Sequence, residues 1–220
     1  MIVRSYMSSP PIVTQPQAPI SEALKLMRDR HIRRLPVLDG SGRLVGIVSD
    51  RDLLHAEPSP ATSLSVWEIT YLLSRITVDT VMTRDVVTVT PDTPLEHAAQ
   101  LMCERKIGGL PVMDRDVVVG VITETDVFRV FTQLLGAGEP GVAVTAFALD
   151  RQGLLADVTR AIADAGGDVR AIASYPPQTA EAAPERAVET AIFIKVSGVT
   201  FDLLAAAVRP FVERIEEQRS

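Results

Sequence analysis

The 220-residue sequence has few residues that bind metals or form disulfides: one cysteine and three histidines. With Cys103 alone, an internal disulfide and a metal site built from several thiolates are both excluded. Cys103 lies within an apolar helical pattern, so we expect a buried thiol. His31, His55 and His97 lie in different predicted elements and lack a metal-binding spacing such as H-x-x-x-H. The sequence therefore predicts no metal site.

Basic residues are outnumbered: 22 Lys and Arg stand against 28 Asp and Glu, with a formal net charge of −6. A nucleic-acid surface needs a basic face, so we expect no nucleic-acid partner. No apolar run approaches the roughly 18 residues of a membrane span, and the first residues lack the pattern of a signal peptide. We therefore expect a cytoplasmic protein with no membrane partner.

Catalytic motifs are also missing. The sequence contains neither G-x-S-x-G nor a P-loop, and it shows no pairing of a nucleophile with a base. We therefore expect no enzyme, although an unrecognised enzyme or enzyme subunit stays open as a third alternative to the two hypotheses developed below.

What the chain does contain is an internal repeat. When Met7 is aligned on Met82, the register holds for about fifty residues with one gap, so the repeat takes priority over local patterns. Each copy has a β-rich segment, a helix, two strands and a capped helix. The β-rich segments are expected at 12–14 and 86–90, and the helices that follow them at 20–30 and 95–105. The strand pairs are expected at 36–38 with 44–48 and at 111–113 with 117–122. The capped helices begin after 49 and after 123.

One motif ends the second strand of each copy: 46–52 reads Gly-Ile-Val-Ser-Asp-Arg-Asp and 120–126 reads Gly-Val-Ile-Thr-Glu-Thr-Asp. A hydroxyl at the start of a helix caps backbone N–H groups that also suit a phosphate. The carboxylates of Asp52 and Asp126, three residues later, share a face with it and can accept both protons of a ribose diol. Ser/Thr-x-x-Asp is also a capping box that only starts a helix, and both interpretations stay open.

These stretches, together with a Leu-Pro-Val in each copy (35–37 and 110–112), resemble CBS domains, and the pair resembles a Bateman module. The resemblance covers residues 1 to about 135 and implies that AMP, ATP or another adenosyl ligand binds between the repeats. It implies that Asp52 and Asp126 hold ribose and that the hydroxyls lie near phosphate. The full set of nucleotide-binding residues it implies is Ser49, Arg51, Asp52, Thr123, Thr125, Asp126, Ile12, Val13, Val87, Thr88, Arg33, Arg34, Pro36 and Pro111.

The two clefts are not expected to be equivalent. Arg33 and Arg34 stand in the first copy at positions where basic side chains of the family reach phosphate, whereas the second copy has Gly108 and Gly109. Arg51 likewise aligns with threonine. Arginine binds phosphate through bidentate contacts, so one cleft should favour phosphorylated ligands. A side chain of one copy can serve the other copy's cleft, so which cleft receives the arginines stays open.

Between the copies, a loop containing Pro58 and Pro60 precedes an apolar pattern at 66–73 that predicts a helix. We expect its Trp67 to be a packed aromatic. This insert, with Tyr-Leu-Leu-Ser at 71–74, is similar to that of acetoin-utilisation B-type CBS proteins.

The segment 136–141 reads Gly-Ala-Gly-Glu-Pro-Gly, but it follows a helix and precedes a β-like run, so we interpret it as a linker. Beyond it, the pattern predicts strands at 142–149, 169–175 and 188–196 and helices at 154–165 and 201–212. A loop is expected at 176–187. Whether a short edge strand forms at 215–219 stays open. The order, with Asp-Arg-Gln-Gly-Leu-Leu at its first turn, resembles an ACT domain. That family binds small effectors, usually amino acids, which implies a site at Asp150, Gly153, Leu154 and Leu155. A purely structural role in dimerisation stays open.

The sequence thus predicts an α/β (α+β) chain in four parts: repeat 1 with its insert (1–76), repeat 2 (77–135), the linker (136–141) and a ferredoxin-like ACT domain (142–220). The leading hypothesis is a homodimeric regulatory sensor that binds an adenosine nucleotide, with a second effector such as an amino acid, no cofactor, and an unknown regulated protein. The alternative is a ligand-free interaction protein whose repeats only dimerise.

Overall fold

The structure is a computed structural model that describes residues 1–56, 75–176 and 189–218. The chain forms two compact units, 1–128 and 129–220, and the boundary between them falls within the helix Glu124–Leu134. The predicted helix at 66–73 lies outside the described residues, as does nearly all of the predicted loop at 176–187. In the part of the chain that is described, no helix combines the length and the apolar character needed to cross a bilayer.

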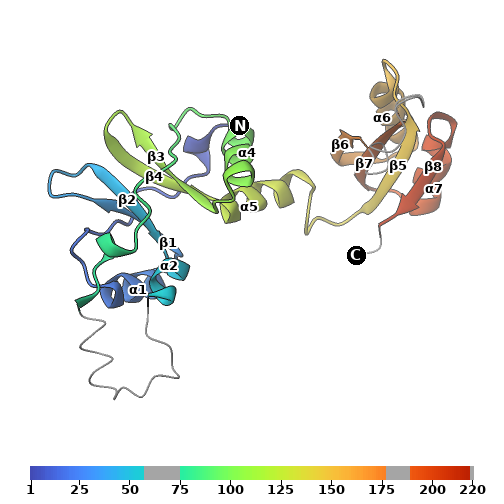
Figure 1. Ribbon diagram of the computed structural model, residues 1–220. Coiled ribbons are helices and arrows are strands. Elements are labelled where there is room, and N and C mark those ends of the chain that lie inside the picture. The colour runs from blue at the N-terminus through green and yellow to red at the C-terminus, as the bar shows by residue number, and fades with distance from the viewer. Residues whose placement is uncertain (57–74, 177–188, 219–220) are drawn as a thin grey trace. The chain divides into compact units, whose positions relative to one another are not determined.

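The first unit contains one arrangement twice, a helix followed by an antiparallel hairpin and a second helix (Figure 1). The first copy consists of α1 (Ile20–Asp29), β1 (Arg34–Leu38), β2 (Leu44–Ser49) and α2 (Asp50–His55); the second consists of α4 (Leu95–Arg105), β3 (Gly109–Asp114), β4 (Val117–Thr123) and α5 (Glu124–Leu134). The β-rich segments before each first helix form only single parallel bridges, Thr14 to Val37 and Val89 to Val112. Strands were expected there, but Pro16 and Pro91 follow closely and have no N–H to extend the pairing.

Helix α4 shows how the helices are seated. Its buried side chains are Leu95, Ala98 and Met102, which recur at helical spacing and form one face. Cys103 follows Met102 by one residue, about 100° further around the helix, and is exposed. The expectation of a buried thiol was therefore wrong, because the apolar pattern alone did not fix which face of α4 is buried.

The opening segment of each repeat packs on the other repeat. Val3 N–H donates to the Thr93 carbonyl (2.9 Å), just before α4, and Val78 N–H donates to the Ala18 carbonyl (3.0 Å), just before α1. Val78 and Met82 are part of the hydrophobic core that α1, β1 and β2 build in the first repeat. The repeats that the sequence delimits are therefore interlocked in space, and the core of the first repeat includes residues of the second.

The glycine of each motif, Gly46 or Gly120, leaves room for the opening segment of the other repeat. A Cβ on Gly46 would lie 2.5 Å from Met82 Sδ, and a Cβ on Gly120 would lie 2.7 Å from Met7 Sδ. Each methionine opens one repeat and covers a strand of the other. A side chain at either glycine would occupy the space of the methionine, which explains why both copies have glycine at this position.

The second unit is a four-stranded antiparallel sheet with the strand order β6-β7-β5-β8. Its elements are β5 (Val142–Leu149), α6 (Leu154–Asp164), β6 (Asp168–Tyr175), β7 (Glu189–Ser197), α7 (Phe201–Val208) and β8 (Arg214–Glu217). This β-α-β-β-α-β order and sheet order are the ferredoxin-like arrangement. The last edge strand, left open by the sequence, forms as β8. Helix α7 is shorter than expected because Pro210 falls in a 3-10 turn, Arg209–Phe211, that follows it.

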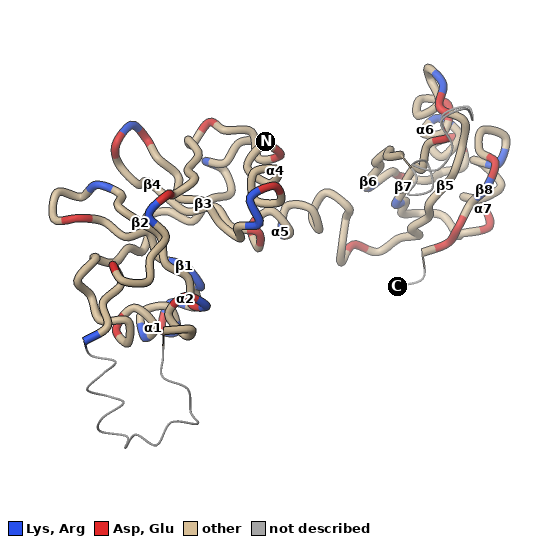
Figure 2. Tube along the Cα trace, viewed as in Figure 1, with Lys and Arg blue, Asp and Glu red and all other residues tan. Residues whose placement is uncertain are grey.

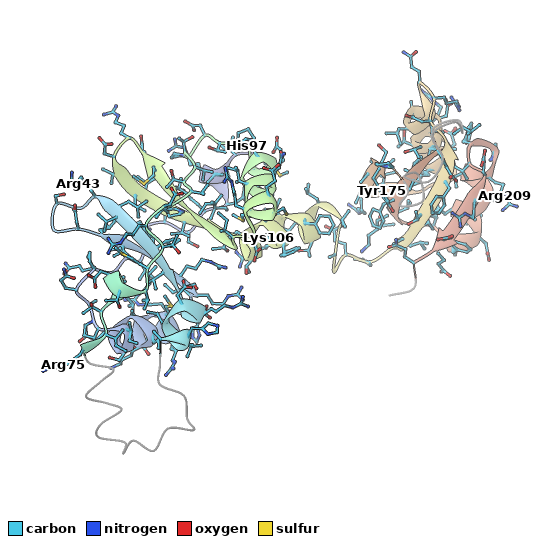
Figure 3. All side chains as sticks on the ribbon, viewed as in Figure 1. Arg43, Arg75, His97, Lys106, Tyr175 and Arg209 are labelled. Atoms are coloured by element: carbon cyan, nitrogen blue, oxygen red, sulfur yellow. The ribbon has the colours of Figure 1, made fainter. Side chains whose placement is uncertain are left out.

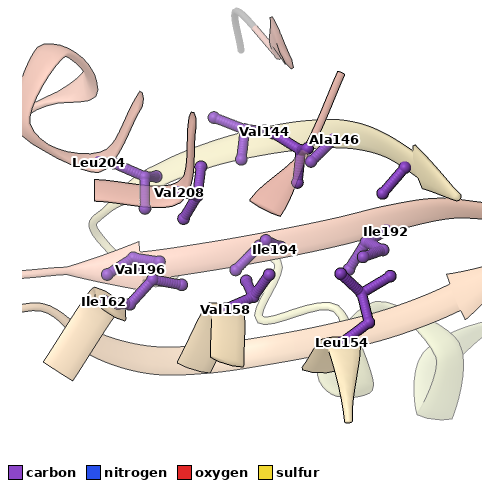
Figure 4. Close-up of a cluster of buried hydrophobic side chains, with 12 residues drawn as sticks. Val144, Ala146, Leu154, Val158, Ile162, Ile192, Ile194, Val196, Leu204 and Val208 are labelled. Carbon is purple, nitrogen blue, oxygen red and sulfur yellow. The ribbon is translucent and has the colours of Figure 1, made fainter. Parts of the chain in front are cut away.

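The core of this unit lies between the sheet and its helices (Figure 4). Alternate residues of β7, Ile192, Ile194 and Val196, point to one face, and Val158 and Ile162 of α6 pack there. The segment 136–141 joins α5 to β5 and no helix follows it, unlike the phosphate loop of a dinucleotide-binding fold. Lys195 Nζ donates to its Gly136 carbonyl (2.5 Å).

The β1–β2 turn makes a testable pH-dependent contribution. Asp39 Oδ1 accepts hydrogen bonds from Ser41 Oγ (2.6 Å), Ser41 N (2.9 Å) and Arg43 N (3.0 Å). These bonds, that of the Ser41 hydroxyl foremost, hold the pKa of Asp39 far below the ordinary aspartate value. Because the folded pKa is depressed, the stabilisation is present above pH 4 or so and is lost as pH falls through the folded pKa.

An NMR titration of the Asp39 carboxyl should show it still ionised at about pH 3, below the ordinary aspartate range. In Ser41→Ala the titration should move back toward that range. A wild-type midpoint near the ordinary aspartate value would contradict the hydrogen bonding seen in the turn.

Candidate nucleotide site

A cavity of about 840 Å³ opens in the first unit, within the size range of small-molecule sites. Its lining combines the junction of β2 and α2 in the first repeat with two segments of the second repeat, 83–87 and 106–109. The exchange of opening segments places 83–87 here, since Thr83 and Ile47 exchange backbone hydrogen bonds of 2.9 Å. Residues of the predicted set that line the cavity are Arg33, Arg34, Ser49, Arg51, Asp52 and Val87.

The Ser49–Asp52 pair forms a complete capping box at the start of α2. Asp52 Oδ2 accepts from Ser49 N (2.9 Å) and from Ser49 Oγ (2.7 Å), while Ser49 Oγ accepts from Asp52 N (3.3 Å). Both residues also line the cavity. The cap uses Oδ2, and among the described residues no donor is recorded for Asp52 Oδ1. Capping and ligand binding are therefore compatible at this carboxylate.

The second copy repeats the bonds that the aspartate accepts, but its Thr123 and Asp126 are not part of the cavity lining. Asp126 Oδ2 accepts from Thr123 N (3.0 Å) and Thr123 Oγ1 (2.7 Å), and Asp126 is only 8% exposed. Neither residue, nor Thr125, is among those that line the cavity. The two motifs thus share their local structure, but the structure places only the first one on this cavity.

The residues expected to flank a base are divided in the same way. Val86 and Val87 are half-buried and line the cavity, whereas Thr88 is exposed and lies beyond it. Their counterparts Ile12 and Val13 are half-buried and lie outside it. Ile12 instead packs against the hydrophobic core of the first repeat.

Pro36 and Pro111 are buried within β1 and β3, outside the cavity lining. The Pro36 carbonyl accepts from Thr14 N (3.0 Å), and the Pro111 carbonyl accepts from Val89 N (3.1 Å). Each proline therefore anchors the segment that precedes the first helix of its own repeat, and the structure gives both a positioning role.

Arg33 and Arg34 reach from the first repeat to the start of α5 in the second. Arg33 Nη2 donates to Thr125 Oγ1 (3.3 Å). Arg34 is partly buried, which lowers its pKa, while the nearby Glu124 carboxylate acts in the opposite direction. Both arginines line the cavity, so the cleft of Asp52 receives them.

Charges of both signs surround the cavity. Figure 2 shows basic and acidic segments close together beside α4 and α5, and Lys106 lies at the end of α4 (Figure 3). The charged lining residues, apart from His55, are Arg33, Arg34, Arg51 and Lys106 against Asp50, Asp52, Asp85 and Glu124. Four formal positive charges thus face four negative ones.

Sequence reasoning missed the charged lining residues Asp50, Asp85, Lys106 and Glu124. A signal was present for two of them, because the repeat alignment places Asp85 against Pro10 and Lys106 against His31. Such changes in charge between copies mark positions where the two clefts differ.

In the second unit, the predicted effector residues surround the start of α6. Gly153 has a φ of 85° and precedes the helix, and Asp150 is exposed. Leu155 is 39% exposed, whereas Leu154 is 3% exposed and belongs to the core. Asp150, Gly153 and Leu155 are therefore exposed to solvent, and Leu154 is not.

Comparisons with known proteins agree with this architecture. The family model described as "CBS domain" matches residues 3–59 and 78–133, just over half of the chain. The chain therefore belongs to the CBS-domain family, and the first unit is a tandem CBS pair, or Bateman module. The mixed α/β fold of this pair is the predicted one.

Three solved structures are similar to this pair. The CBS domain pair of MJ0100, in complex with 5′-methylthioadenosine and S-adenosyl-L-methionine, is 32% identical, with 60% of this chain and 95% of that chain covered and a TM-score of 0.50. CBSX2 in complex with AMP is 32% identical (60% and 97% covered, TM-score 0.51). A candidate acetoin utilization protein (AcuB) from Vibrio cholerae is 33% identical (64% and 98% covered, TM-score 0.51).

Among curated proteins, the L-aspartate semialdehyde sulfurtransferase of Methanocaldococcus jannaschii is 33% identical over 131 residues. The match covers 59% of this chain but only 23% of the sulfurtransferase. Similar CBS pairs therefore bind adenosine-containing ligands and occur within larger proteins.

Proposed function

We propose that this protein is a regulatory sensor that binds an adenosine nucleotide in the cavity of the first unit. The observation that carries the proposal is that the Ser49–Asp52 pair of one repeat lines the same cavity as Val86 and Val87 of the other. A carboxylate suits a ribose diol and an apolar wall suits a base, while Arg33, Arg34 and Arg51 offer charge to a phosphate. The AMP and adenosyl ligands of the similar CBS pairs support this assignment.

Sensing requires that the ligand change an equilibrium that a partner reads. The cavity is built from both repeats, so a ligand bound there favours one arrangement of the pair over others. In this proposal the protein itself is not a catalyst, and the regulated partner is a separate protein. A cellular role like that of acetoin-utilisation B-type proteins is supported by the likeness to AcuB.

The test is calorimetry on the full chain with adenosine, AMP, ATP and S-adenosyl-L-methionine. We expect saturable binding of at least one of them, and a higher melting temperature, because a ligand that binds only the folded state stabilises it. Absence of binding for all four would favour the alternative, a ligand-free interaction protein in which Ser49 and Asp52 only cap α2.

We further propose that the protein is a homodimer. Leu54 of α2 and Phe128 of α5 occupy equivalent positions in the two repeats and are 50% and 65% exposed. Exposed apolar residues at repeated positions suit a second copy as partner. Light scattering at micromolar concentration should give the mass of a dimer; a monomer with and without AMP would refute this.

For the second unit, the ferredoxin-like order and the turn around Gly153 support an ACT domain that binds a small effector such as an amino acid. A thermal-shift screen of the full chain with the amino acids, compared with a Gly153→Val variant, tests it. No stabilisation by any amino acid would leave the structural role as the better description.

A further inference from the structure

The side chain of Arg34 occupies space that the second repeat leaves open at Gly108. A Cβ on Gly108 would overlap Arg34 Nη2 and would lie 2.7 Å from Glu124 Oε2. At Gly109 a Cβ would lie 3.3 Å from Arg34 Cδ. An alanine at 108 is therefore incompatible with the observed position of the guanidinium.

This contact explains why the repeats differ at these positions. Positions 33 and 34 of the first copy align with 108 and 109 of the second, and Arg34 contacts both of these glycines, the counterparts of Arg33 and Arg34. Arginine in both copies would overlap and would bring like charges together. The Gly-Gly of the second copy is thus the complement of the Arg-Arg of the first.

Glu124 is the carboxylate that faces Arg34 there. Its Oε2 and Arg34 Nη2 both lie next to Gly108, and Glu124 is the largest of the charges that stabilise the protonated guanidinium. Asp50 and Asp52 act in the same sense and more weakly, while Arg33 acts against it. Because Glu124 lines the same cavity as Arg34, an anionic ligand group that approaches Arg34 meets the carboxylate as well.

We propose that Glu124 is a specificity-determining residue of this cavity, which competes with the anionic group of the ligand for Arg34 and disfavours ligands of high negative charge. The inference rests on the proposed nucleotide function and deepens it. With Asp50 and Asp85 in the same lining, it assigns to the site adenosine ligands of lower negative charge, such as the monophosphate, over the triphosphate.

Glu124→Gln tests this with little change in shape. Calorimetry should show affinity for AMP raised by about fivefold, for ATP by more, and for adenosine by less than twofold, since only charged groups gain. The gain should shrink as salt rises. Glu96→Gln is the matched control, because Glu96 is exposed in the first turn of α4 and lies outside the cavity. An equal change for adenosine and ATP, or unchanged ATP affinity, would overturn the proposal.

Gly108→Ala is expected to have the opposite effect, because its methyl group would overlap the Arg34 guanidinium and displace it from the cavity wall. The methyl group would also lie 2.7 Å from Glu124 Oε2, but this side chain has the smaller overlap and moves less. AMP and ATP affinity should fall toward that of Arg34→Gln, with adenosine little changed. Gly40→Ala is the control, since a Cβ on Gly40 would have no neighbour within 4 Å. Retained ATP affinity in Gly108→Ala would contradict the role given to Arg34.

A ligand-independent readout separates this inference from the proposed function. If wild type binds none of the adenosine compounds, the proposed function fails, yet the electrostatic coupling of Glu124 to Arg34 is still measurable. Glu124→Gln should shift the melting temperature less in an Arg34→Gln background than in wild type, because the partner charge is already gone. Equal shifts in the two backgrounds would show that Glu124 and Arg34 are not coupled.

Discussion

Replacing Gly120 by alanine is expected to lower the free energy of unfolding by about 1–3 kcal/mol, the usual cost of inserting atoms into a packed site. The new Cβ would lie 2.7 Å from Met7 Sδ and 2.9 Å from the Ser8 carbonyl oxygen. The methionine tail can rotate, but Ser8 is fixed by two backbone hydrogen bonds with Val121, of 2.9 Å and 3.1 Å. The first segment of the chain would have to leave β4 to make room.

Gly46→Ala and Gly40→Ala give a graded control series. At Gly46 the closest atoms belong to the flexible Met82 side chain, and the Thr83 carbonyl lies further away at 3.1 Å, so a smaller loss is expected. Gly40 has no such neighbours. Urea unfolding of the full chain, followed by circular dichroism, measures all three. If Gly120→Ala is as stable as Gly40→Ala, the exchange of opening segments is wrong.

Asp52→Ala is expected to weaken AMP binding at least tenfold. A hydrogen bond to a charged group contributes about 1.5–3 kcal/mol, and about 1.4 kcal/mol corresponds to a factor of ten. The same change removes the capping box of α2, which costs roughly 0.5–2 kcal/mol of stability. Calorimetry with AMP and urea unfolding separate these two effects.

Asp126→Ala is the matched control, because it removes the same box from the second repeat but lies outside the cavity. It should lose at least as much stability, since Asp126 is almost fully buried, and keep AMP affinity at the first cavity. Equal loss of affinity in the two variants would mean that the effect of Asp52→Ala is structural. Unchanged AMP affinity in Asp52→Ala would exclude nucleotide binding by Ser49 and Asp52.

The sequence predicted the repeat, its elements and the two motifs because each depends on local patterns. Ser49 and Thr123 stand where a strand ends and a helix begins, and the helices α2 and α5 do start at the next residue. The strand boundaries were displaced by one or two residues, as at β1, which begins at Arg34 rather than Pro36. The capping interpretation is confirmed at Ser49, where ligand binding stays a prediction.

Local patterns could not predict that the opening segment of each repeat packs on the other repeat. Met7 and Met82 align perfectly well within their own copies, and nothing in local periodicity shows that each covers the glycine of the other copy. The contrast of Arg34 with Gly108 was visible, and it was interpreted as a loss of phosphate attraction in one cleft. Its packing reason, the overlap of the two positions in space, requires the three-dimensional structure.

The interlocked repeats have a consequence during synthesis on the ribosome. Ser9 Oγ donates to the Val119 carbonyl, a contact between residues 110 positions apart. At about 5–20 residues per second, roughly 5–20 s pass between synthesis of the two, apart from the time in the exit tunnel. For that interval the first segment has no strand to pair with, and for the earlier part of it the first repeat also lacks Val78 and Met82 of its core. The nascent first repeat is therefore open to chaperones and proteases until the second one has emerged, and its yield in a cell should depend on how fast residues 57–121 are translated.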